Sequence, residues 1–413
     1  MSTTTHASHP DQVLADLADW QRNVREQFPI LRAAGQQAYL DSAATAQKPQ
    51  AVLDAVHHYL ITANANAGRG TYRWANESTA LVQRCADRVR ELLDDPHPDH
   101  SGVHFVSGTT EALRRIALDW LPALLTDGDE IIVPDADHLA NVTAWTEARD
   151  TLERHGVHVR LVPMPYEPSG DYDIAALAGL VNERTRLVAA THVHHVYGVD
   201  MNVHRIRRVV GDEVLICLDA AQSIGHLPVS VTDLDVDFLA FSGHKAMALP
   251  GVGALWARNT RGPRYEHRGW DGSPNTTGLV SLIAAVDWFD ATDLRRIADW
   301  TVALGARLTD GLHHIPGIQV LGCQDSLTLG STVQRRHGLV SLRRPEISSA
   351  DLGFVLAEHG LMVRANAHCQ GPAGERETSV RVSLHAYNTI EEIDALLEVL
   401  QRLDASLPTP SHR

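Results

Sequence analysis

A lysine that follows an apolar run is the first candidate for chemistry in this sequence. Ser242-Gly243-His244-Lys245 comes directly after residues 238–241, a run that predicts a buried strand. Ligands of α/β proteins bind just past the carboxyl ends of such strands. Burial there lowers the pKa of a lysine, and a neutral amine condenses with an aldehyde to a Schiff base. The same string also fits a solvated turn, so Lys245 needs support from elsewhere in the chain.

That support comes from Asp219, which ends a second apolar run at residues 214–218. Pyridoxal phosphate binds to a lysine as an imine and needs a carboxylate against its ring nitrogen, because the proton held there makes the ring an electron sink. The separation from Lys245 leaves room for one helix or loop and one strand, so two neighbouring parallel strands would present both side chains at one edge. Alone, Asp219 fits a helix N-cap equally well.

Residues 214–245, VLICLDAAQSIGHLPVSVTDLDVDFLAFSGHK, resemble the class V aminotransferase family of fold-type I pyridoxal phosphate enzymes. The similarity is greatest to the group II cysteine desulfurases and selenocysteine lyases, and it runs from about Phe28 to about Leu403. The resemblance implies an α/β fold: a large domain with a mostly parallel seven-stranded sheet between helices, and a small α+β C-terminal domain. The expected divisions are an N-terminal segment at 1–30 that packs on the small domain, the large domain at 31–285 and the small domain at 286–413.

The composition excludes several other classes of protein. A chain of 413 residues is long enough for two domains, and a net charge of −15 argues against a nucleic-acid partner. No apolar run approaches the roughly 18 residues of a membrane span, and the first residues lack a signal-peptide pattern. The four cysteines form neither a disulfide framework nor a CxxC metal pair. We therefore expect a cytoplasmic protein without a membrane partner.

Regular elements must position these residues. Alternating and apolar runs predict strands at 103–106, 130–134, 187–191, 318–321 and 338–342. Apolar residues at helical spacing predict helices at 12–27, 278–313, 349–359 and 390–402. Together with the runs that carry Asp219 and Lys245, the first three strands indicate one large sheet, and the remaining strands and helices indicate an α+β unit at the end of the chain.

A phosphate site is expected where residues 103–106 lead into Ser107-Gly108-Thr109-Thr110 and then a helix. Free backbone N–H groups, hydroxyls and the positive end of the helix dipole meet at such a turn, although a simple helix cap would have the same sequence. The resemblance favours phosphate binding by Thr109 and Thr110. It implies the same for Ser242 and His244, and a cofactor contact for Gln222.

Two histidines are expected on the cofactor. Asp137-His138-Leu139-Ala140-Asn141 is similar to the family's Glu-His-His-Ala-Asn, so the resemblance implies that His138 stacks on the ring and moves protons. Where the family usually has Ser-Asn, this chain has His194-His195, and His195 takes the position of an Asn that contacts the ring oxygen or the substrate. With His192 these histidines are candidate metal ligands, but strand alternation puts His195 on the opposite face, so we predict no metal site.

The substrate is expected to be an α-amino acid. Arg381, in Val380-Arg381-Val382, matches the family's arginine that binds the substrate carboxylate, and a guanidinium fork suits a carboxylate. Residues 39–44, YLDSAA, are also typical of the family, and the small Ala43 would let a substrate approach the backbone. Arg364 begins RANAHCQGP, which aligns with the family's cysteine loop.

Cys369 in that loop is the predicted sulfur acceptor. In cysteine desulfurases the thiolate attacks the sulfur of the bound cysteine and leaves alanine and an enzyme persulfide. A nearby base or positive charge favours the thiolate, and His368 and Arg364 are the candidates. A free buried thiol is the alternative interpretation.

A homodimer with composite active sites is also expected. Residues 272–278, GSPNTTG, are similar to a family motif whose hydroxyl contacts the phosphate of the partner subunit, which makes Ser273 or Thr276 the candidate. Residues 256–265 fall in a region that is shorter than in the family and that in related desulfurases reaches into the partner's site.

The favoured hypothesis is thus a pyridoxal phosphate-dependent cysteine desulfurase or selenocysteine lyase, with Lys245, Cys369 and His138 as catalytic residues and a sulfur-acceptor protein as a candidate partner. His194-His195 and the short 256–265 region keep a second reading open: a class V enzyme of a biosynthetic pathway, such as a C–S lyase or epimerase. A catalytically silent scaffold or sulfur-carrier partner is a third, and it predicts no bound cofactor.

Overall fold

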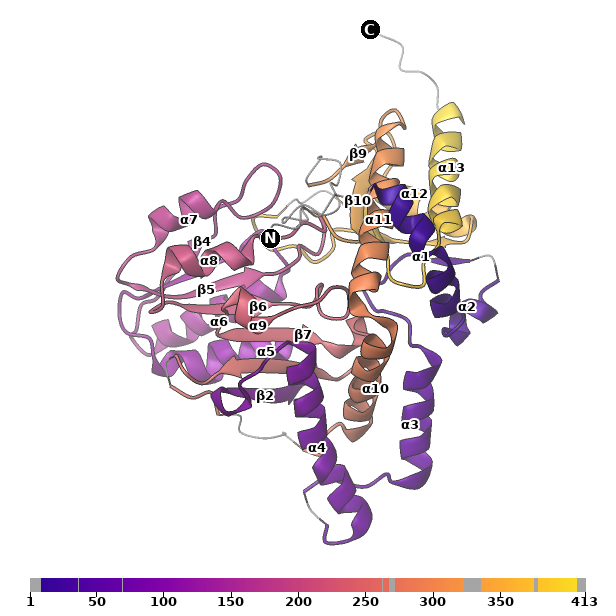
Figure 1. Ribbon diagram of the computed structural model, residues 1–413. Helices are drawn as coiled ribbons and strands as arrows, with labels where there is room; N and C mark the ends of the chain where they lie inside the picture. Colours follow the sequence, from indigo (N-terminus) through magenta and orange to yellow (C-terminus); the bar gives the residue numbers. More distant parts are fainter. Residues whose placement is uncertain are drawn as a thin grey trace, which may run out of the picture.

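A seven-stranded sheet forms the centre of the computed structural model, which describes residues 9–406 except 36, 69, 262, 267–271, 323–335 and 375–377 (Figure 1). Its strand order is β2-β8-β7-β6-β5-β3-β4, and all strands are parallel except β8, which runs antiparallel to both neighbours. The strands are β2 (Ser101–Val106), β3 (Glu130–Val133), β4 (Arg160–Pro163), β5 (Thr185–Thr191), β6 (Leu215–Asp219), β7 (Phe238–Ser242) and β8 (Gly253–Arg258). The predicted mostly parallel sheet is confirmed.

Both faces of this sheet are covered, which explains why its strands are apolar throughout rather than alternating. One face packs with helices that share a large core: α3 (Gln50–Thr62), α4 (Arg73–Leu92), α7 (Ile174–Leu180), α8 (Val203–Val210), α9 (Val231–Leu234) and α10 (Thr276–Thr292). The other face packs with α5 (Thr109–Arg115), η2 (Ile116–Trp120) and α6 (Ala140–Arg154). Short 3-10 turns complete this part: η1 (Pro98–His100), η3 (Leu121–Ala123) and η4 (Gly243–Lys245).

The register of the central strands brings their carboxyl ends together. Thr191 at the end of β5 pairs with Asp219 at the end of β6, and Asp219 pairs with Ala240 in β7. Lys245 lies in η4, immediately after β7. The predicted meeting of Asp219 and Lys245 at one sheet edge therefore follows directly from the strand pairing.

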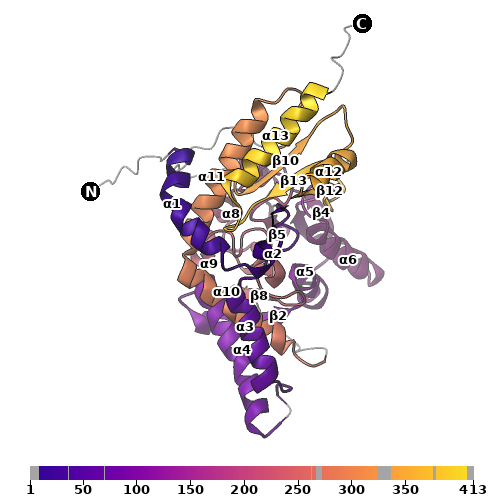
Figure 2. The same cartoon turned by 90° about the vertical axis from the view of Figure 1, so that its right-hand side faces the viewer.

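A smaller sheet, of order β12-β13-β10-β9, lies at the C-terminal end of the chain (Figure 2). Its strands are β9 (Gln319–Val320), β10 (Leu339–Arg343), β12 (Arg364–Asn366) and β13 (Ser379–Ser383), and its helices are α11 (Leu294–His313), α12 (Ser349–Glu358) and α13 (Ile390–Ser406). The pair β1 (Ala38–Tyr39) and β11 (Leu361–Met362) adds a two-stranded sheet beside it. These elements share a separate apolar core.

The N-terminal helices connect the two cores. Leu14 of α1 (Pro10–Arg25) belongs to the core of the C-terminal elements, whereas Val24 and Leu31, the latter in α2 (Pro29–Ala33), belong to the core of the large sheet. The N-terminal segment thus contacts more than the small domain. The division of the chain at 285 and 286 falls inside α10 and stays a prediction.

The helix predicted at 278–313 is wrong as a single element, because it is two. Asp293 separates α10 from α11 with a backbone φ of 73°, and its side chain accepts a hydrogen bond from the backbone N–H of Arg295 (3.0 Å). Aspartate tolerates this left-handed conformation and caps the next helix, which apolar spacing alone does not reveal.

Among the described residues, no helix is long and apolar enough to cross a membrane.

Candidate active site

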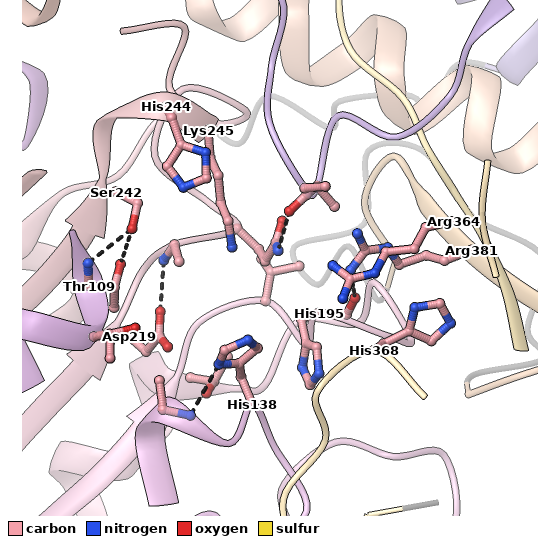
Figure 3. Close-up of a pocket in the computed structure, with 18 residues that line it drawn as sticks. Thr109, His138, His195, Asp219, Ser242, His244, Lys245, Arg364, His368 and Arg381 are labelled. Atoms are coloured by element: carbon pink, nitrogen blue, oxygen red, sulfur yellow. Dashed lines mark hydrogen bonds between the residues drawn. The ribbon is translucent and has the colours of Figure 1, made fainter. Parts of the chain in front are cut away.

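A cavity of about 250 Å³ opens at the carboxyl ends of β5, β6 and β7 (Figure 3). Its wall comes from the large sheet on one side and from the small sheet on the other. Most of the residues predicted for the site line it: Ala43, Thr109, Thr110, His138, His195, Asp219, Gln222, Ser242, His244, Lys245, Arg364 and Arg381. The structure thus gathers residues from positions 43 to 381 around one space.

Lys245 reaches this cavity from the end of β7. Burial lowers the pKa of its amine to about 8, and the nearby carboxylate of Asp219 offsets part of that effect. His244 also lines the cavity, and burial lowers the pKa of its imidazole to about 4, so it adds no charge at neutral pH. Lys245 therefore exists in part as the neutral amine that imine formation requires.

Asp219 is the only carboxylate among the described residues that line this cavity. It is almost completely buried, and its Oδ1 accepts a hydrogen bond from the backbone N–H of Ala221 (2.9 Å). Burial raises its pKa to about 6, which that hydrogen bond and Lys245 partly counter. With a pKa of about 6, this carboxylate is mostly ionised at neutral pH. It can therefore stabilise a proton on a basic ring nitrogen placed against it.

Hydroxyl and backbone N–H groups collect at the start of α5. The Thr109 N–H donates to the Ser242 Oγ (2.9 Å), and the Thr109 hydroxyl lies 2.9 Å from the same atom. A Cβ added to Gly108 would come within 3.0 Å of that oxygen, so glycine is what allows this close approach. Gln222 lines the cavity too, but its amide donates to the Ala43 carbonyl (3.1 Å) and so supports the wall.

His138 and His195 meet edge to face on another wall, with ring centres 5.0 Å apart. Burial lowers the pKa of His138 to about 4, and its Nδ1 accepts a hydrogen bond from the backbone N–H of Ala140 (3.2 Å). The proton of the neutral ring is therefore on Nε2. His195 is buried, its pKa lies well below the ordinary value because of burial, and neither ring nitrogen has a hydrogen-bond partner among the described residues.

The prediction that residues 192–195 continue a strand is wrong. β5 ends at Thr191, and the chain then turns, with the carbonyl of His194 accepting from the Gly198 N–H (2.8 Å). His194 consequently does not line the cavity. No group of three or more histidine, cysteine or carboxylate side chains in the described part of the chain could hold a metal ion.

Arg381 is a fully buried cation at the small-domain wall. Its guanidinium donates to the His195 carbonyl and to the Asp41 carboxylate, both at 3.1 Å, while its buried Nε has no partner among the described residues. Asp41 is a residue that the sequence reasoning missed as a partner. It stands in the YLDSAA segment, but nothing local indicates a contact with a residue 340 positions away.

Cys369 lies at the rim of the cavity rather than in its wall. Its side chain is exposed, and its Sγ is 3.6 Å from the Nη2 of Arg364, which does line the cavity. The neighbouring His368 is buried and its Nε2 pairs with the Ser379 hydroxyl (2.8 Å), while burial lowers its pKa to about 3. Of the two candidates to assist the thiolate, the structure places the positive charge of Arg364 next to the sulfur, not a basic histidine.

Ser273 and Thr276 lie elsewhere. Neither lines this cavity; Ser273 is exposed before α10, and Thr276 is the buried first residue of that helix. Within its own subunit the chain does not bring them to the other predicted phosphate ligands.

These residues fit pyridoxal phosphate. The cavity presents an amine, a buried carboxylate and a cluster of hydroxyl and N–H donors. The unpartnered nitrogens of His195 and Arg381 are buried polar atoms that call for a polar ligand. The fold and the site together define a pyridoxal phosphate-dependent enzyme of fold type I.

Comparisons with known proteins agree. The aminotransferase class-V family model matches residues 38–396, so the chain belongs to that family. It is 32% identical to a cysteine desulfurase of Pectobacterium carotovorum, over 92% of this chain and 97% of that relative. It is also 32% identical to a probable cysteine desulfurase of Mycolicibacterium paratuberculosis, of which it spans 58%. The predicted family, fold class and cofactor are confirmed.

The solved structures include a similar protein. The apo structure of a cysteine desulfurase from Thermococcus onnurineus superposes with a TM-score of 0.82 at 26% identity, and the match covers 94% of this chain and 98% of that one. The two chains thus share their overall fold over nearly their full lengths.

The lowered pKa of Lys245 predicts how cofactor capture depends on pH. Only the neutral amine reacts with the aldehyde, so the rate at which the cofactor-free protein takes up pyridoxal phosphate rises about tenfold per pH unit up to about pH 8 and then levels off. Stopped-flow absorbance measures this rate. Burial also lowers the pKa of Lys48 to about 8, so the variant Lys48→Met is the control and keeps the same midpoint. A midpoint near that of free lysine contradicts the assignment.

Proposed function

We propose that this protein is a cysteine desulfurase, which takes sulfur from L-cysteine, or selenium from selenocysteine, and leaves L-alanine and a persulfide on Cys369. The observation that carries the proposal is the common cavity of Lys245, Asp219 and Arg381, with the Cys369 thiol beside Arg364 at its rim. The names of the relatives, cysteine desulfurases that share 32% identity over most of the chain, support it.

Pyridoxal phosphate, when bound, supplies an aldehyde for the substrate amine and a ring that accepts electrons. Lys245 holds it and afterwards moves a proton at its Nζ, for which a pKa of about 8 is suitable. Asp219 would hold the ring nitrogen and His138 would cover the ring face. Thr109, Thr110, Ser242 and His244, which line the same cavity, would hold the phosphate.

The substrate is held by its carboxylate at Arg381. The guanidinium is already oriented by the Asp41 carboxylate and the His195 carbonyl, and its Nε remains for a ligand. A preoriented guanidinium loses little rotational freedom when a carboxylate binds, which strengthens the clamp. Ala43 also lines the cavity, and its small side chain leaves room for the substrate.

Sulfur transfer requires the Cys369 thiolate. Its sulfur bonds to the substrate sulfur while the C–S bond of the substrate breaks, so that L-cysteine and the thiol become L-alanine and a persulfide. The Nη2 of Arg364 lies 3.6 Å from this sulfur and donates toward it, which helps to orient the attacking atom. A sulfur-acceptor protein then takes the sulfur from an exposed position.

The purified protein tests this proposal directly. It is expected to show the visible absorbance of bound pyridoxal phosphate, to change that spectrum with L-cysteine, and to release alanine in proportion to persulfide. A protein that binds the cofactor but ignores L-cysteine while another amino acid is turned over would contradict the desulfurase assignment and favour a different class V activity.

The proposal includes a homodimer in which Ser273 or Thr276 contacts the partner's phosphate. Helices α3 and α4 form an arm that projects from the rest of the chain (Figure 2). Large apolar side chains are exposed near the end of α3 and the start of α4: Leu60, Ile61, Tyr72 and Trp74. An exposed apolar cluster of this kind is typical of a subunit interface.

Disruption of that cluster is expected to separate the subunits. Ile61→Asp places a charge on a side chain that is 67% exposed in the single chain, so it leaves the fold of the subunit intact but not the dimer. Light scattering is expected to give twice the chain mass for the wild type and the chain mass for the variant, with weaker cofactor binding. Ile30→Asp, at another exposed position, is the matched control. A monomeric wild type contradicts the composite site.

A further inference from the structure

His194 sits behind the cavity wall as a fully buried, neutral imidazole. Its ring stacks on Tyr197 with centres 4.3 Å apart and an interplanar angle of 9°. Its Nδ1 accepts hydrogen bonds from the backbone N–H groups of Val196 and Tyr197, both at 3.2 Å. The proton of the ring is therefore on Nε2, and the ring orientation is fixed from two sides.

The Nε2 of His194 faces a second buried group, the Asp137 carboxylate, with 3.5 Å between the Nε2 and Oδ1 atoms. That carboxylate also accepts hydrogen bonds from the hydroxyls of Tyr172 (2.6 Å) and Tyr166 (2.9 Å). Both Asp137 and His194 are completely inaccessible to solvent. Burial raises the pKa of Asp137 to about 6, and hydrogen bonds with Tyr172, Thr191 and Tyr166 offset part of this rise.

Asp137 and His194 lie next to the two histidines that line the cavity, His138 and His195. The ring of His195 lies 4.9 Å from that of His194, and on its other side it meets the edge of His138 at 5.0 Å. Since neither nitrogen of His195 has a described partner, packing alone orients this ring. Asp137 directly precedes His138, and the turn that carries both is held by the carboxylate's contacts with the two tyrosines.

We propose that Asp137 and His194 form a buried positioning pair, which fixes the ring of His195 through packing and the turn of His138 through the carboxylate. Neither residue touches the cavity contents; both act through the two imidazoles that do. The inference deepens the proposed function and rests on it in one respect, the placement of His138 and His195 against the bound cofactor.

A double-mutant cycle separates a coupled pair from two independent buried residues. Asp137→Glu adds a methylene inside a closed cage, and His194→Ser removes a ring and leaves the carboxylate without its imidazole neighbour. Each change is expected to lower the melting temperature by about 3 °C or more. In the double variant the longer carboxylate enters the space that the ring leaves, so its loss is expected to be smaller than the sum of the two. His204→Ser, the same change at an exposed helix position, is the control and is expected to have no effect.

The positioning role must be tested by a measurement that does not depend on the stability of the protein. The visible circular dichroism of the bound cofactor, divided by its absorbance, reports the asymmetry of the rings around it. His194→Ser is expected to reduce this ratio and raise KM for L-cysteine more than it lowers kcat, whereas His204→Ser changes neither. Additive melting-temperature losses, or an unchanged dichroism ratio in His194→Ser, would overturn the proposal. A wild type without a visible cofactor band contradicts the proposed function instead, and the stability cycle still tests the coupling.

Discussion

Replacement of Lys245 by alanine is expected to reduce alanine formation from L-cysteine by about 10²–10⁴-fold or more, because one side chain both attaches the cofactor and moves the proton. Its amine lines the cavity beside Asp219, and burial gives it a pKa of about 8. In the folded wild type, borohydride reduction followed by mass spectrometry is expected to show the cofactor fixed to Lys245. Lys245→Ala loses this adduct.

Lys48→Met is the matched control for that experiment. Lys48 has a similarly lowered pKa and lies next to the same backbone, with its Nζ 3.4 Å from the His244 carbonyl, but it does not line the cavity. It is expected to retain the adduct and most of the activity. An adduct that persists in Lys245→Ala would place the attachment elsewhere and contradict the site as described.

Cys369→Ala is expected to lose persulfide formation completely and to bring alanine formation from L-cysteine down to background, because no other thiol of the described chain lies at the cavity. Cys85 and Cys217 are both buried. Burial also raises the pKa of the Cys85 thiol far above its usual range, so it remains protonated. Labelled cyanide, which removes the outer sulfur of a persulfide as thiocyanate, measures the sulfur bound to the protein.

The control for this variant is Cys85→Ala, which removes a thiol that donates to the Leu279 carbonyl (3.6 Å) inside the core. It is expected to cost some stability and to leave persulfide formation intact. Cofactor binding in Cys369→Ala is expected to be normal, since Cys369 lies outside the cavity wall. Full sulfur release by Cys369→Ala would refute its role as acceptor.

The sequence predicted the sheet and its catalytic edge well, and the reason is local. Runs such as 214–218 and 238–241 are apolar on every residue, as strands buried on both faces must be, and the polar residue that ends each run marks the ligand-binding edge. Family motifs then supplied His138, Thr109 and Arg381. All of these side chains line the cavity.

Contacts between residues far apart in the chain could not be predicted from local sequence patterns. The Asp41–Arg381 ion pair joins two ends of the chain, and no periodicity in either segment indicates it. The turn after β5 was taken for strand because alternation cannot tell where a strand stops. The structure ends the strand at Thr191, with His195 in the cavity wall and His194 behind it, stacked on Tyr197. Whether Ser273 or Thr276 completes a second subunit's site depends on an assembly that a single chain does not contain.

The cysteine loop is held to the large domain by its own main chain. The Leu139 N–H donates to the Cys369 carbonyl (2.8 Å), the Gly371 N–H to the Asp137 carbonyl (2.6 Å) and the Ala373 N–H to the Asp135 carbonyl (3.0 Å). Three such anchors within five residues leave the thiol little freedom to travel. If sulfur is stored on Cys369 as proposed, the loop cannot move the persulfide away from the cavity. The nucleophile of the sulfur-acceptor protein must therefore reach the rim of the cavity itself.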